Sequence, residues 1–215
     1  MKFAICYKGA FNINYVKQKG VDDNLLNIVN DTILNHKTMI YSDLIEAGNE
    51  VDTFISSYNL DNRLNDLLVR GYDAKGYIFF DKNQLNSGTW MAQLNHLKFL
   101  IELVKTEERN NNFNYDYLIF TRFDVDFHKN YNTFNLELDK LNITVEHPSG
   151  NCDDNLWIFP RNYLDIFENS VDALIAENKI THELNHKIIN FGGQINYIDK
   201  LIDSYMGHTI FSFIR

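Results

Sequence analysis

Two aspartates, Asp124 and Asp126, lie one residue apart, and their side chains and spacing suit a chemically active site. They follow an apolar run rich in aromatic and β-branched residues (117–123), which predicts a buried strand. On a continuing strand both carboxylates would point to the same side and could address one divalent cation. By the same alternation, Arg122 is expected to neutralise a phosphate or to orient Asp124. Such a site suits a phosphorylated substrate.

Two familiar aspartate motifs fit this acidic pair poorly. An EF-hand loop needs Gly at its sixth position and Glu at its twelfth, where this chain has Lys129 and Asn135. A haloacid-dehalogenase phosphatase normally carries its aspartates after the first strand of the domain, whereas this pair follows the fourth predicted strand. A simple solvated turn after a strand stays open as the structural alternative.

Length and composition favour one α/β domain. The chain has 215 residues, 45% of them hydrophobic and 23% charged, and no Pro/Gly/Ser-rich linker divides it. The formal charge of -9 argues against a general nucleic-acid surface. Two cysteines, Cys6 and Cys152, are too few for a disulfide framework, so we expect a cytoplasmic protein with no transmembrane segment.

The elements that must position the acids alternate in the first half. Strands are predicted over 3–7, 51–56 and 76–80. Helices are predicted from Leu25 to Leu44, around 60–68, and after Ser87 until the asparagines at 110–112. With the strand before Asp124, this order predicts a mainly parallel sheet with helices on both faces.

The second half is less regular. Short strands are expected over 143–146 and 156–159, antiparallel at the sheet edge. Pro160 is expected to open a helix that carries Tyr163, Phe167, Leu174 and Ile175. A last helix is predicted to carry Ile198, Leu201, Ile202 and Tyr205.

The stretch from Ser87 to Phe127 resembles the GT-A class of nucleotide-sugar glycosyltransferases. There a long helix with Gln93, Leu97 and Leu100 leads through Asn114-Tyr115-Asp116-Tyr117 into Thr121-Arg122-Phe123-Asp124-Val125-Asp126. Small polysaccharide-type transferases of bacteria and large DNA viruses carry a similar helix and strand, and a chlorella virus transferase domain is similar in size. The resemblance implies one Rossmann-like GT-A domain over 1–215, within a protein that could be longer.

The resemblance also implies a division of labour. Residues 1–127 would bind a UDP-sugar donor and residues 128–215 a glycan acceptor. The nucleotide would contact the turn after the first strand and the end of the second strand, together with the residues around the acidic pair. The expected nucleotide-binding residues are Tyr7, Lys8, Gly9, Ala10, Ser57, Tyr58, Arg122 and Asp124.

A metal and a base complete the implied site. Asp124 and Asp126 would hold Mn²⁺ or Mg²⁺, with His208 as the candidate third ligand; a surface or core histidine is the alternative there. Asp154 or Asp153 would act as general base if the reaction inverts the anomeric centre. An N-cap or turn role stays open for both.

A second metal motif competes with this hypothesis. The segment 182–186 reads His-Glu-Leu-Asn-His and matches the H-E-x-x-H pattern of zinc peptidases, with His182 and His186 as ligands and Glu183 as base. Lys187 and the absence of a downstream Glu count against a peptidase. A catalytically silent nucleotide-sugar-binding module is the third possibility.

Overall fold

The computed structural model of the chain describes residues 1–9, 20–81, 89–147, 149–199 and 210–213. Within these residues a seven-stranded sheet has the order β3-β2-β1-β4-β7-β6-β8, and a second sheet pairs β5 with β9. The strands are β1 (Lys2–Lys8), β2 (Glu50–Tyr58), β3 (Ala74–Phe80), β4 (Tyr117–Arg122), β5 (Val125–Phe127), β6 (Leu141–Ile143), β7 (Leu156–Pro160), β8 (Ile195–Tyr197) and β9 (Phe211–Phe213).

The first half of the chain follows the predicted order. Strands β1 to β4 are parallel. The helices between them are α2 (Asp23–His36), a π-helical turn (Lys37–Tyr41), α3 (Ser42–Glu46), α4 (Asn62–Gly71) and α5 (Thr89–Asn111). The Asp22 side chain caps α2 by accepting a hydrogen bond from the Leu25 amide at 2.9 Å. The expected cap of α5, Ser87, lies outside the described residues.

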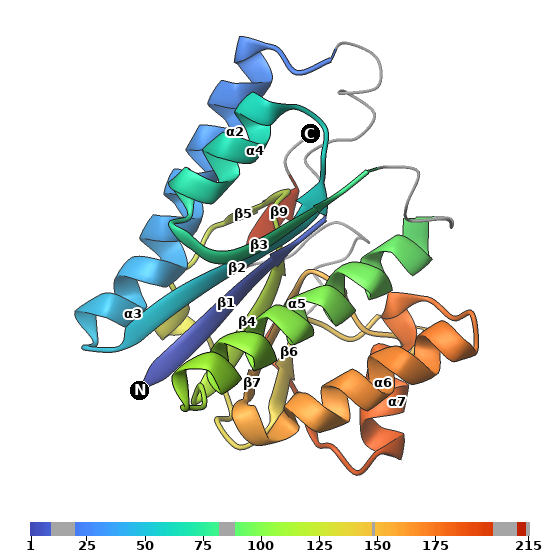
Figure 1. Cartoon of the computed structure of the whole chain (residues 1–215). Helices are drawn as coiled ribbons and strands as arrows, with labels where there is room; N and C mark the ends of the chain where they lie inside the picture. The colour runs from blue at the N-terminus through green and yellow to red at the C-terminus, as the bar shows by residue number, and fades with distance from the viewer. Residues whose placement is uncertain (10–19, 82–88, 148, 200–209, 214–215) are drawn as a thin grey trace.

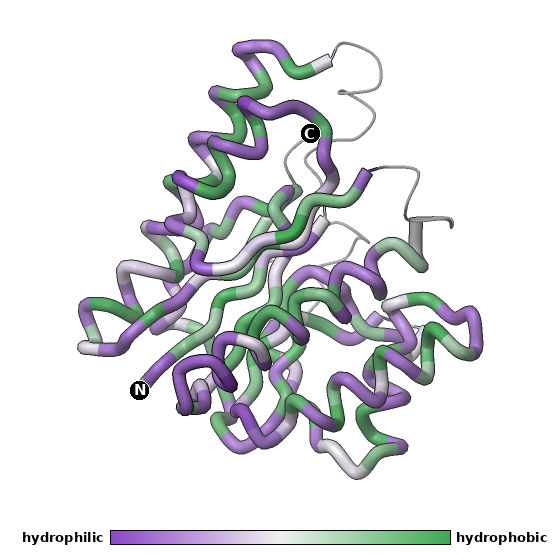
Figure 2. The backbone as a smooth tube through the Cα atoms, viewed as in Figure 1, coloured by the Kyte–Doolittle hydropathy of each residue, from purple (hydrophilic) through white to green (hydrophobic). Residues whose placement is uncertain are grey.

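Helices cover both faces of the large sheet (Figure 1). On one side Phe3, Ile5 and Tyr7 of β1 pack in the hydrophobic cluster formed with α2, α3 and α4. On the other side Ala4 and Cys6 pack in the cluster formed with α5 and with helix α6 (Leu164–Ala176). Hydrophobic residues accordingly concentrate on the central strands (Figure 2). Strand residues alternate between the two faces of a sheet. Lys8, two residues after Cys6, therefore projects to the same side as Cys6, toward α5.

The second half differs from the prediction in detail. Strand β7 runs antiparallel to both β4 and β6, and β8 adds in parallel to β6. Helix α6 (Leu164–Ala176) starts after a 3₁₀ turn, because Pro160 still belongs to β7. Helix α7 (Leu184–Asn190) was not predicted. Of the predicted last helix, Ile198 is not helical, and Leu201, Ile202 and Tyr205 lie outside the described residues.

The expectation of one continuous strand through the acidic pair is wrong. Strand β4 ends at Arg122, Phe123 and Asp124 form a turn, and Asp126 lies in β5, which pairs antiparallel with β9. Phe123, Val125 and Phe127 are all buried, so the alternation of apolar residues continues through the turn and hides it in the sequence. The described part of the chain has no helix long and apolar enough to cross a membrane.

Candidate functional site

The candidate site lies where the parallel strands end. Lys8 at the end of β1 is in register with Ser56 of β2 and with Arg122 of β4. Since β7 runs antiparallel, its beginning lies at the same edge, and the Asn155 carbonyl accepts a hydrogen bond from the Arg122 amide at 3.3 Å. The chain leaves β1 toward β2 and β3 and returns to β4 on the other side. Open α/β sheets bind ligands at such a switch point.

Lys8 is a fully buried cation at this edge. Its side chain is 1% exposed, and its Nζ lies 3.9 Å from Oδ2 of Asp154 and 4.9 Å from the ring centre of Trp157. Among the described residues no hydrogen-bond partner meets this Nζ. Burial lowers the pKa of Lys8 to about 8, although Asp154 opposes the shift. A buried ammonium group with unused donors is suited to an anionic or hydroxyl-rich ligand.

Asp154 and Asp153 have different surroundings although they are adjacent. One oxygen of Asp154 lies 3.5 Å from Nη1 of Arg122, near Lys8. Burial alone would raise the pKa of Asp154, but Lys8 and Arg122 outweigh it and hold the pKa below its ordinary value. Asp153 instead accepts a hydrogen bond from the Asn155 amide at 3.0 Å, and burial raises its pKa to about 6. Asp154 is therefore the carboxylate whose charge the neighbouring cations stabilise, whereas Asp153 shapes the turn.

Arg122 also binds Asp124, although Asp124 lies in a turn and not on a continuing strand. Its Nε and Nη2 donate to the two oxygens of Asp124 at 2.7 and 2.6 Å, a bidentate pair. Arg122 thus bridges Asp124 and Asp154, and together with Lys8 these residues form a cluster of two cations and two carboxylates at the sheet edge.

Strand β5, which carries Asp126, is fixed by helix α2. The side chain of Asn35 exchanges two hydrogen bonds with the backbone of Phe127, at 2.8 and 2.9 Å. The His36 ring lies 2.6 Å from the carbonyl oxygen of Val125, and burial lowers the pKa of His36 to about 4, so it binds as a neutral imidazole. The short strand is therefore held from its helix side as well as by β9.

Asp126 is the carboxylate whose surroundings best fit a cation. Burial raises its pKa, with His128 opposing and Asp31 adding to the shift. Such a group gains from a positive charge, and hard carboxylate oxygens suit Mn²⁺ or Mg²⁺. Asp124 shares its charge with Arg122, and the expected third ligand, His208, lies outside the described residues.

The expected nucleotide turn has a defined backbone. Gly9 has φ +101°, a conformation that L side chains rarely adopt, and its amide donates to the Ser56 carbonyl at 3.1 Å. The Ser57 hydroxyl donates to the Gly9 carbonyl at 2.8 Å. Tyr58 packs edge-on against His96. Ala10 lies outside the described residues.

Tyr7 contributes differently from the other residues expected to bind the nucleotide. Its side chain is 1% exposed and stacks on His36, on the face of the sheet opposite to Lys8. It also packs against Tyr72 and Phe123. The side chain therefore belongs to the hydrophobic core, and the Tyr7 backbone lies between β2 and β4 in the sheet.

The H-E-x-x-H segment does not converge on one point. His182 lies in a 3₁₀ turn with its Nε2 4.0 Å from Oδ1 of Asp154, whereas His186 in α7 is exposed and lies 3.3 Å from Oδ1 of Asn151. Glu183 pairs with Lys179 at 3.3 Å. No group of three His, Cys, Asp or Glu side chains that could hold a metal occurs within the described ranges.

Sequence reasoning missed two polar residues that reach this edge from elsewhere. Thr181 lies 3.5 Å from Oδ2 of Asp154 and 3.1 Å from Oε1 of Gln93 on α5. His96, also on α5, lies 2.7 Å from the Ser56 hydroxyl, and burial lowers the pKa of this imidazole to about 3. Neither residue belongs to a recognisable motif, and local spacing does not reveal which strand end a helix crosses.

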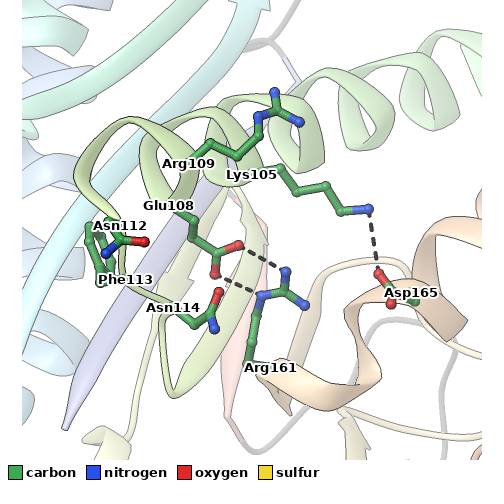
Figure 3. Close-up of a pocket in the computed structure, with 8 residues that line it drawn as sticks. All are labelled: Lys105, Glu108, Arg109, Asn112, Phe113, Asn114, Arg161 and Asp165. Carbon is green, nitrogen blue, oxygen red and sulfur yellow. Dashed lines mark hydrogen bonds and ion pairs between the residues drawn. The ribbon is translucent and has the colours of Figure 1, made fainter.

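A cavity of about 410 Å³ lies near the amino end of β4, at the opposite end of the strands from the candidate site. Arg161 there makes a bidentate ion pair with the buried carboxylate of Glu108, at 2.7 and 2.9 Å, and Lys105 faces Asp165 (Figure 3). These charges are paired with one another. This cavity is remote from the cluster at the carboxyl edge, and we assign it no part in the chemistry.

Comparison with known proteins establishes the fold. The chain is similar over 93% of its length to a structure described as a nucleotide-diphospho-sugar transferase from Desulfovibrio desulfuricans G20, with 8% identity, a TM-score of 0.52 and 80% of that chain covered. It is also similar to an active-site mutant of LgtC, with 11% identity, a TM-score of 0.50, 92% of this chain and 72% of that chain covered. The fold is GT-A-like. No family model matches the sequence, and no curated protein matches it either.

Proposed function

We propose that the protein is a metal-dependent glycosyltransferase that moves a sugar from a UDP-sugar to a hydroxyl group of a glycan. The observation that carries the proposal is the cluster of Lys8, Arg122, Asp124 and Asp154 at the carboxyl edge of a GT-A-like sheet. This edge is where such folds bind nucleotides. The free thiols of Cys6 and Cys152 fit a cytoplasmic setting.

The donor would lie across the ends of β1, β2 and β4. The Gly9 turn allows close approach of a nucleotide to the backbone, and Ser57 holds that turn in place. Arg122 and Lys8 offer positive charge to the diphosphate or hydrogen bonds to the sugar. Asp126 and Asp124 would hold Mn²⁺ or Mg²⁺, which supplies Lewis-acid stabilisation of the departing nucleotide.

Ionised Asp154 has a defined part in this scheme. Its charge offsets the repulsion between Lys8 and Arg122, and it gives the sugar or acceptor hydroxyls an acceptor for hydrogen bonds. Lys8 and Arg122 thereby stay in position before the substrate arrives. Preorganised charge of this kind lowers the cost of reorganisation during transfer.

Calorimetry of UDP binding tests the proposal. We expect UDP to bind more tightly with Mn²⁺ than with EDTA, because Asp126 and Asp124 would hold the cation and its charge would attract the diphosphate. Equal affinity under the two conditions would contradict this role of the cation. A panel of UDP-sugars, with UDP release as the readout, would then identify the donor, and peptide substrates left intact would exclude the zinc-peptidase alternative.

A further inference from the structure

We propose that His182 is the group that takes the proton from the acceptor hydroxyl, with Asp154 holding its imidazole in place. This inference rests on the proposed function and deepens it. It also gives a role to a histidine that the zinc motif brought to attention and that the metal scheme does not use. The observation behind it is the approach of the two side chains at the sheet edge, Nε2 of His182 lying 4.0 Å from Oδ1 of Asp154.

Asp154 itself is poorly suited to accept the proton. Its carboxylate is buried, and one oxygen already lies within 3.9 Å of Lys8, Arg122 and Thr181. Buried Lys8 and partly buried Arg122 stabilise the charged form, which weakens a carboxylate as a base. Protonation would also leave the cations facing one another without an anion between them.

His182 has the complementary properties. Its side chain is 23% exposed, against 5% for Asp154, so it lies between the buried cluster and solvent. Its carbonyl oxygen accepts a hydrogen bond from the Cys152 amide at 2.8 Å, which ties the 3₁₀ turn to the segment that carries Asp154. Histidine is the side chain that ordinarily changes charge between pH 5 and 8.

Further titratable groups surround this pair. His147 stacks obliquely on His182, with ring centres 5.6 Å apart. Glu183, on the same turn, is paired with Lys179. Asp154 is a carboxylate that lies near the His182 ring, with its Oδ1 4.0 Å from Nε2, so it would stabilise the positive charge of a protonated imidazole.

The proposed step balances as a direct displacement. The acceptor oxygen forms a bond to the anomeric carbon while the bond from that carbon to the diphosphate breaks, and UDP leaves with the electron pair. The acceptor proton passes to the imidazole of His182, and the resulting imidazolium faces the Asp154 carboxylate. Solvent then removes the proton. Attack opposite the leaving group inverts the configuration of the anomeric carbon.

The experiment compares His182→Ala with His186→Ala, a control in the same motif whose side chain is exposed. With a UDP-sugar found by the donor panel, we expect kcat for UDP release to fall about 100-fold or more in His182→Ala only, which is typical for the loss of a general base. The KM for the donor should stay within about twofold, as for a group that acts in the transition state. Added imidazole should restore part of the rate.

Proton NMR of the first sugar released, recorded before it equilibrates in solution, should show the inverted anomer. Retention, or a kcat for His182→Ala within a few-fold of His186→Ala, would overturn the role of His182. If His182→Ala does not fold, His182→Gln provides the same comparison. Failure of the wild-type protein to bind UDP or to release it from any UDP-sugar would instead remove the proposed function itself.

Discussion

Charged side chains lie at both ends of strand β4, and the two ends differ in the hydrogen-bond partners of these charges. At its amino end, the Arg161 guanidinium forms a bidentate pair with Glu108, and the Glu108 carboxylate also accepts a hydrogen bond from the Tyr115 amide at 3.1 Å. At its carboxyl end, Lys8 has an ion-pair partner but no hydrogen-bond partner among the described residues. The first arrangement is complete without a ligand, whereas the second is not.

This difference separates a self-contained ion pair from one that is suited to a ligand. A buried pair with satisfied donors holds its elements together and gains nothing from further ligands. A buried cation whose donors are unused costs folding free energy, and a ligand that meets those donors recovers it. The cavity at the amino end lies beside the complete pair.

The largest effect should come from Asp126→Asn. This change removes the negative charge that would hold the cation, and we expect kcat/KM for transfer to fall by about 1,000-fold or more. The fold should be retained, because Asn has the same shape and the raised pKa of Asp126 shows that its charge is not stabilised by the core. Activity assays and thermal unfolding check both points. Wild-type activity would move the catalytic centre away from β5.

Glu108→Gln tests the ion pair at the amino end of β4. It leaves the Arg161 cation without its anion in a place where Glu108 is 5% exposed. We expect a loss of about 3 to 5 kcal/mol in the free energy of unfolding, as for other broken buried pairs, with little change in kcat. Urea denaturation and the UDP-release assay measure these quantities. A large loss of kcat in the folded variant would mean that the two ends are coupled.

Lys8→Met should reveal how much unfolding free energy the buried ammonium group of Lys8 costs. The pKa of Lys8 is lowered to about 8 in the folded protein, so between pH 8 and its ordinary value of 10.5 the unfolded chain binds more protons. The unfolding free energy of the wild type should therefore rise with pH across this window relative to Lys8→Met. The rise should be at most about 3 kcal/mol. A flat difference would show that the ammonium group of Lys8 reaches solvent.

Glu183→Gln should have the smallest effect. Its ion pair with Lys179 lies at the surface, where such pairs contribute about 0 to 1 kcal/mol. In the proposed transferase this carboxylate has no role, so activity and metal content should not change. Loss of activity together with bound zinc would restore the peptidase hypothesis.

Local sequence patterns were sufficient to predict the parallel half of the fold. Apolar strands and amphipathic helices alternate from Phe3 to Arg122, and the helix periodicity of Leu25, Val29 and Ile33 matches their burial in α2. The edge where Lys8 and Arg122 meet follows from the expectation that parallel strands end together. The pairing of Arg122 with Asp124 also followed from their spacing.

The remaining features depend on contacts between distant segments. The turn at Phe123 was hidden because burial of Val125 and Phe127 continues the alternation on the far side of it. The register of Asp126 with Ser212 joins residues far apart in the sequence, a pairing that no local window contains. The approach of His182 to Asp154 likewise depends on how α6 and α7 pack.

The pairing of β5 with β9 has a consequence for synthesis of the protein on the ribosome. The acid-bearing strand is translated long before Phe211 to Phe213, which supply its neighbour. During that interval its open side lacks β9, and contacts with segments already made, such as those of Asn35 and Phe134 with Phe127, are available to hold it. In the proposed transferase the acid-bearing strand would therefore gain its neighbour late, once residue 213 has emerged from the exit tunnel.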